Sequence, residues 1–189
     1  MMSPFEFVAA FFSIVLGLGL AHVLGGISSL LEARARVRTD WVHSVWIITI
    51  LLILIHSWWG MWALQAAPAW PYAAFLSLVA YLVALYIVAT LLLPRVPEQG
   101  PIDLGGHFHS IRPLFLSFVS AAFAMGAVLN YTLFATGLVS IFVLAPGIAF
   151  VLTLVGALTR NRLYNAVLAV FILLSFVALM VSDTTTLTS

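Results

Sequence analysis

The nine residues Glu32-Ala-Arg-Ala-Arg-Val-Arg-Thr-Asp40 separate two long apolar stretches and decide the fold of this chain. Before them, residues 7–31 contain no Asp, Glu, Lys or Arg, and after them no formal charge occurs from Trp41 to Pro94. A helix needs about 20 apolar residues to cross the hydrocarbon core of a bilayer. The first stretch therefore predicts one membrane span. The second predicts two spans, joined at the prolines of Gln65-Ala-Ala-Pro-Ala-Trp-Pro71.

The same pattern continues to the carboxyl terminus. Residues 94–112 are polar and rich in proline and glycine, and we predict that they form the longest loop. Residues 113–159 are again free of charge and predict a second hairpin, which Arg160-Asn-Arg162 closes. We therefore predict an all-α, polytopic membrane protein in which residues 1–189 form a single integral membrane domain. Its six transmembrane helices are expected at about residues 5–31, 41–64, 72–93, 113–134, 138–159 and 163–182.

The positive charges predict the orientation of these helices. All seven are arginines, and the predicted spans place them only in the first, third and fifth connections: Arg34, Arg36, Arg38, Arg95, Arg112, Arg160 and Arg162. Cytoplasmic loops retain an excess of Lys and Arg. We therefore expect the arginine-bearing loops in the cytoplasm and both termini on the non-cytoplasmic side. The short loops favour a bacterial inner membrane.

The composition excludes several classes of protein. The chain is 64% hydrophobic and 7% charged, with a mean hydropathy of +1.20, whereas about a quarter of the residues in soluble domains are charged. The net charge of +1 argues against a nucleic-acid partner, because phosphate binding needs a basic face. Cysteine is absent, which excludes disulfides and thiolate metal sites. We expect a lipid bilayer as the surroundings and no cofactor.

The first span carries small residues at helical spacing, namely Gly17, Ala21 and Gly25. Small residues let the backbones of membrane helices approach closely. This pattern predicts a packing seam, either inside the bundle or between protomers. A polar path that starts at Glu6 is the alternative for the same face of the helix.

The histidines suggest two further kinds of site. His22 and His56 are intramembrane candidates for haem ligands, but their expected depths differ by about 9 Å. A histidine bonded to a neighbouring helix is the simpler interpretation. His107-Phe-His109 could supply metal ligands, although structural zinc sites usually need four. We therefore interpret this tripeptide as part of a solvated loop and expect no metal.

The fifth span contains Pro146 and Gly147, which predict a kink because proline removes a backbone hydrogen bond. Broken helices often frame transport sites in membrane proteins. Asn130 and Tyr131, near the end of the fourth span, are the nearest polar side chains in the expected topology. With Glu6 and His22 as gates, these residues define a hypothetical solute path.

Two classes of function follow. The first is a small channel or transporter for an uncharged or weakly polar solute, which the predicted break at Pro146 favours. The second is a non-catalytic scaffold or accessory subunit, assembled as a homo-oligomer or with a partner membrane subunit through the small residues of the first span and the tryptophans of the second. An enzymatic or haem-binding role is a distant third, and we expect no catalytic residues. The sequence favours transport slightly over the scaffold.

Overall fold

A computed structural model describes residues 4–66, 70–133 and 137–182 of the chain. In these residues six helices are long and apolar enough to cross a membrane, which confirms the predicted all-α class and number of spans and fits a multi-pass membrane protein. They are α1 (Pro4–Glu32), α2 (Trp41–Gly60), α3 (Tyr72–Leu92), α4 (Leu104–Leu133), α5 (Ile141–Leu158) and α6 (Arg162–Ser182). A 3-10 helix, η2 (Met61–Ala66), extends α2.

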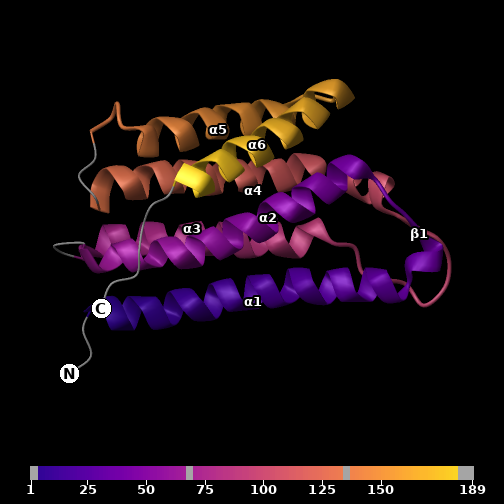
Figure 1. Ribbon diagram of the computed structural model, residues 1–189, viewed down its shortest axis with the longest axis horizontal. Helices are drawn as coiled ribbons and strands as arrows, with labels where there is room; N and C mark the ends of the chain where they lie inside the picture. The colour runs from indigo at the N-terminus through magenta and orange to yellow at the C-terminus, as the bar shows by residue number, and fades with distance from the viewer. Residues whose placement is uncertain (1–3, 67–69, 134–136, 183–189) are drawn as a thin grey trace.

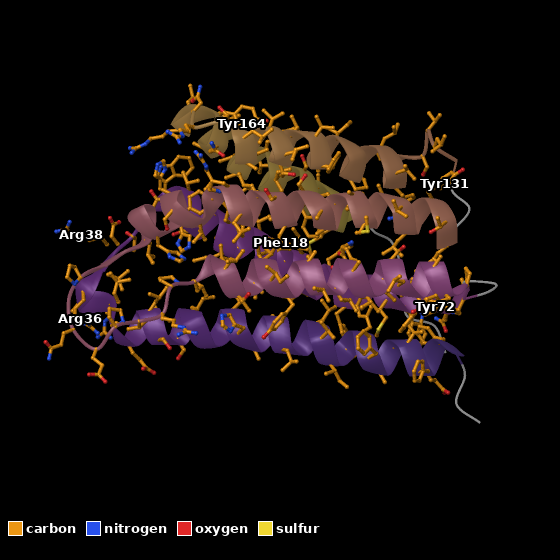
Figure 2. The ribbon with its side chains drawn as sticks, turned by 180° about the vertical axis from the view of Figure 1, so that it is seen from behind. Arg36, Arg38, Tyr72, Phe118, Tyr131 and Tyr164 are labelled. Carbon is orange, nitrogen blue, oxygen red and sulfur yellow. The ribbon has the colours of Figure 1, made fainter. Side chains whose placement is uncertain are left out.

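The helices lie side by side in an elongated bundle (Figure 1). α1 forms one side and packs against α2, α3 and η2, whereas α5 forms the other side and packs against α4 and α6. Arg36 and Arg38 lie at one end, which we call the arginine end, and Tyr72 and Tyr131 lie at the other (Figure 2). The chain thus crosses the bundle in alternating directions, as a series of membrane spans requires.

The start of α4 corrects the predicted boundary of the fourth span. The helix begins at Leu104 rather than at Pro113, which lies inside it. The Asp103 carboxylate accepts hydrogen bonds from the backbone N–H groups of Gly105 and Gly106, each at 3.1 Å, and so caps the helix. A Cβ at Gly106 would lie 2.8 Å from the Asp103 Oδ2 atom, so glycine is what lets the carboxylate close over the helix start.

The connections at the arginine end are tied together. Strand β1 (Val37–Arg38) pairs in parallel with β2 (Ile102–Asp103). The Arg36 guanidinium donates hydrogen bonds to the carbonyl oxygens of Pro97 and Gly100, at 3.1 and 3.0 Å. Gly100 has a φ of +95°, which glycine adopts without strain. The segment before α4 is therefore held to the α1–α2 connection at several points.

Replacement of Arg36 by Gln is expected to loosen this link. Two hydrogen bonds to carbonyl oxygens are lost, and we expect amide hydrogen exchange at Ile102 to rise about five-fold, as the loss of about 1 kcal/mol implies. Arg34→Gln is the control, because the Arg34 guanidinium bonds only to the Leu31 carbonyl of its own helix end. Equal exchange at Ile102 in the two variants would contradict the link.

The middle of the bundle is filled by apolar side chains. Leu54 of α2, Leu82 and Val88 of α3, and Leu116 of α4 are at most 2% exposed, and they belong to one continuous cluster with Val23 of α1. Such packing drives association of helices in lipid, where apolar attraction between them is weak.

Candidate functional site

Two hollows lie at the arginine end, and the larger of them lies between α1 and the end of α3. We call it the α1–α3 groove, and its volume is about 560 Å³. It is lined by Ala21, His22, Gly25, Gly26 and Ser29 of α1, by Thr90 of α3, and by Leu93, Pro94, Arg95 and Val96 of the following connection. The groove brings together a predicted intramembrane histidine, two seam residues and one of the topological arginines.

The local sequence explains why the groove forms. Gly26 lets α1 approach Leu93 closely, since a Cβ at this position would lie 2.6 Å from a Leu93 methyl carbon. Ala21 and Gly25 carry little or no side chain, so the adjoining wall is recessed. The backbone leaves α3 in an extended conformation at Leu93, which carries Arg95 to the mouth of the groove.

His22 and Arg95 are the two groups in this groove that can bear a positive charge. Both side chains are exposed, and neither makes a hydrogen bond or ion pair with any residue in 4–66, 70–133 or 137–182. Ser29 and Thr90, by contrast, bond back to the carbonyls of Gly25 and Ile87. The groove therefore offers two side chains with free N–H donors, His22 and Arg95, beside two hydroxyl groups. No carboxylate lines it.

The outer face of α1, which we define by Gly17, Ala21 and Gly25, is exposed along its length. No atom lies within 4 Å of a Cβ built at Gly17 or Gly25. Gly19 and Gly26 point the other way, and a Cβ there would contact Leu54 at 3.5 Å and Leu93 at 2.6 Å. Of the two places predicted for the seam, inside the bundle or between protomers, Gly17 and Gly25 do not form it inside the bundle, where Gly19 and Gly26 provide the close contacts.

His43 and His107 cap the end of α3. The His43 Nε2–H group donates to the Leu92 carbonyl at 2.6 Å, and the His107 ring bonds to the Leu91 carbonyl at 3.2 Å. Helix ends leave such carbonyls without partners in their own helix. The two rings are nearly perpendicular, with centroids 5.9 Å apart. The prediction of a solvated loop at His107 is therefore wrong.

His109 is exposed on α4, two residues after His107. Within the described residues no group of three or more His, Cys, Asp or Glu side chains is placed to hold a metal ion. The His-x-His spacing thus reflects one structural histidine and one that faces outward.

Arg112 corrects a second prediction. It was expected in a loop, but it lies in α4 and is 5% exposed. It shares the buried side of this helix with Phe108 and Phe115, whose rings contact those of His43 and Trp46. The Nε atom of Arg112 is buried and has no partner among the described residues, which is also true of the Trp46 Nε1 and His43 Nδ1 atoms. The helical start at Leu104 draws this arginine into the protein.

We expect Arg112→Met to raise the stability of the protein. The Arg112 Nε–H group is buried without a partner among the described residues, and an apolar chain of similar length removes this desolvation penalty of about 1–3 kcal/mol. The measurement is the unfolding midpoint in detergent. Arg160→Met is the control, since Arg160 is exposed and its replacement should change little. A lower midpoint for Arg112→Met would show that the guanidinium has a stabilising partner outside the described chain.

The residues of the hypothetical solute path are not brought together. Glu6 and His22 belong to α1, whereas Pro146 and Gly147 belong to α5 on the opposite side of the bundle (Figure 1). Asn130 and Tyr131 lie near the end of α4, the neighbour of α5, far from the arginine end (Figure 2). The Asn130 amide donates to the Gly126 carbonyl of its own helix at 2.9 Å, and Tyr131 is exposed.

The fifth span, in which Pro146 and Gly147 predict a kink, is one helix, α5, from Ile141 to Leu158 with Pro146 inside it. Neither of the two hollows, both at the arginine end, is lined by Pro146, Gly147 or Asn130. Of the residues in the hypothetical solute path, His22 alone borders one of these two hollows.

The histidines considered as haem ligands also lie apart. His22 lines the groove between α1 and α3, whereas the ring of His56 contacts that of Phe176 on α6, with centroids 5.3 Å apart. These two side chains do not face one another across a shared space.

Comparison with known proteins gives no relatives. The chain matches no known protein family, and neither a curated protein nor a solved structure resembles it significantly. Its function must therefore be argued from its own residues.

Proposed function

We propose that this protein is a non-catalytic scaffold of a bacterial inner membrane, which assembles with a second copy of itself through the outer face of α1. The arginine end lies in the cytoplasm in this proposal, as the positive-inside rule predicts. The observation that supports it is the open space at Gly17 and Gly25, in contrast with the close contacts at Gly19 and Gly26 of the same helix.

A second copy fits this face for a geometric reason. Two copies inserted in the same direction are related by a two-fold axis along the membrane normal, so their α1 helices run parallel. Small residues four apart allow parallel membrane helices to cross in close contact. Ile14, Leu18 and Leu24 are 63%, 56% and 49% exposed beside the small residues, and they supply the side chains that would pack across the axis.

Transport has less support. The middle of the bundle is filled by apolar side chains, and the residues of the hypothetical path lie on opposite sides of it. Because α5 continues through Pro146, it is not divided into two half-helices whose ends could bind a solute or ion. A homo-oligomer joined along α1 needs no such path.

Cross-linking through a single cysteine tests the proposal directly. The chain contains no cysteine, so Ala21→Cys introduces one thiol on the outer face of α1. Oxidation of native membranes is expected to yield a covalent dimer, because equivalent positions meet at a two-fold axis. The control is Val151→Cys, at a position that is 54% exposed on α5, on the far side of the bundle.

Three outcomes would count against the proposal. They are the absence of a cross-link at Ala21→Cys, equal cross-linking at Val151→Cys, and a cross-linked product whose mass requires a different protein. The last outcome would keep the α1 face as an interface but replace the second copy by another subunit.

A further inference from the structure

We infer that the α1–α3 groove binds the phosphate-bearing headgroup of an anionic phospholipid, with Arg95 as the residue that recognises the charge. The inference concerns a ligand rather than the assembly. The groove shares Ala21 and Gly25 with the outer face of α1, but Arg95 lies outside that face. Four features carry it: the position of the groove, its lining, the state of Arg95, and the balance of charge around it.

The groove lies where a headgroup would lie. It runs from Ala21 to Ser29 along α1, about 12 Å at 1.5 Å per residue, and ends at the connection that follows α3. Its α1 wall lies in the last part of the span Phe5–Glu32, and its residues Leu93 to Val96 lie just beyond the span Tyr72–Leu92. Basic pockets between transmembrane helices on the cytoplasmic side are typical sites for anionic headgroups.

The lining of the groove is partly polar. His22, Ser29, Thr90 and Arg95 all border the groove. The second hollow, on the α2 side of α1, has a volume of about 310 Å³ and a mostly apolar lining, with Arg34 at its edge. The α1–α3 groove therefore combines a cation with hydroxyl and imidazole groups. This combination suits the phosphate of a lipid beside Arg95 and its ester groups beside the hydroxyl and imidazole groups.

The arginines around the groove differ in how they are used. Arg36 is held by the carbonyls of Pro97 and Gly100, and Arg34 bonds to the Leu31 carbonyl. Arg95 makes no such bond within the described residues, so all of its donors remain available. A guanidinium binds phosphate through two parallel hydrogen bonds, which makes Arg95 a suitable anchor.

The charge around the groove also favours an anion. Its lining contains Arg95 and His22 but no Asp or Glu. Glu98, in the same connection as Arg95, is exposed and does not line the groove. An anionic headgroup would therefore meet donors and a cation without a facing carboxylate.

The test compares Arg95→Gln with Arg38→Gln. Both arginines are exposed at the same end, and their replacement changes the net charge equally, but Arg38 lines neither hollow. The unfolding midpoint is followed in detergent while phosphatidylglycerol or phosphatidylcholine is added, because a ligand that binds the folded state raises the midpoint. In separate samples inorganic phosphate is added alone.

We expect phosphatidylglycerol, but not phosphatidylcholine, to raise the midpoint of the wild-type protein. For Arg95→Gln the concentration needed for half of this effect should rise about five-fold, the factor that corresponds to one charged contact of about 1 kcal/mol at a membrane surface. Arg38→Gln should behave as the wild type.

Several results would overturn the inference. An equal loss of apparent affinity for phosphatidylglycerol in Arg95→Gln and Arg38→Gln would indicate a general effect of surface charge. Equal stabilisation by both lipids would remove the headgroup selectivity, and full stabilisation by inorganic phosphate would replace the lipid by a free anion. Since Arg95 has no partner in the described chain, an Arg95→Gln variant that unfolds without added lipid would also contradict the inference. The variants of this test, at Arg95 and Arg38, leave the outer face of α1 unchanged, so a failure here is distinguishable from a failure of the cross-link at Ala21→Cys.

Discussion

The double variant Gly17→Leu and Gly25→Leu is expected to be monomeric under conditions in which the wild-type protein is a dimer. Both positions have open space around a Cβ, so the leucines do not disturb the protomer. In the proposed dimer the same side chains would hold the two α1 backbones apart. Overpacking of this kind costs about 1–3 kcal/mol at each site, which corresponds to an association weaker by about 5- to 150-fold per site.

The measurement is the fraction of dimer in lipid nanodiscs or mild detergent, determined by single-molecule photobleaching. Gly126→Leu and Gly147→Leu are matched controls, because they also have open space but belong to α4 and α5. They are expected to leave the dimer intact. If the α1 double variant remained a dimer, or if the controls dissociated as well, the outer face of α1 would not be the interface.

Gly156→Val is expected to lower the free energy of unfolding by about 1–3 kcal/mol. A Cβ at this position would lie 2.6 Å from a methyl carbon of Leu168 on α6, and 3.1 Å from one of Leu116 on α4. The same Cβ would lie 3.3 Å from the Asn165 Oδ1 atom. Glycine is therefore what allows α5 to lie close to both neighbouring helices, and valine would push them apart.

Gly147→Val provides the comparison within the same helix. It introduces the same side chain into α5, but nothing lies within 4 Å of a Cβ at this position. Both variants share the change in helix propensity, so the difference between their unfolding midpoints isolates the effect of packing. Equal midpoints would mean that α5 does not pack against α4 and α6 at Gly156 as described.

Much of the fold could be predicted from the positions of charged residues. A span of about 20 residues without charge has few alternatives to a membrane helix, and the arginines mark where one span ends and the next begins. For this reason the ends predicted for the first three helices lie close to those observed, as at Glu32, Trp41 and Tyr72. The turn between α4 and α5 cannot be compared throughout, since residues 134–136 lie outside the described part.

The start of α4 could not be predicted in this way, because two local signals compete there. The stretch without charge begins only after Arg112, and this set the predicted start at residue 113. The competing signal was Asp103 followed by Leu104, Phe108 and Phe115, an N-cap before apolar residues at helical spacing. Proline inside a membrane helix is tolerated where neighbouring groups compensate, so Pro113 does not prevent the helix from starting earlier.

The site depended on contacts between helices, which a single sequence does not contain. His22 was a candidate from its position in a span, but its neighbour Arg95 comes from a connection far along the chain. The roles of His43 and His107 depend on where α3 ends, because their partners are the carbonyls of Leu91 and Leu92. Similarly, the small residues of α1 predicted close packing but not which side of the helix faces the bundle.

A density map of the protein in lipid nanodiscs would test the central claim most directly. We predict two copies related by a two-fold axis along the membrane normal, with their α1 helices in contact at Gly17, Ala21 and Gly25. A single copy with this face against lipid, or a water-filled passage that reaches Pro146 from either side of the membrane, would contradict the proposal of a scaffold assembled through α1.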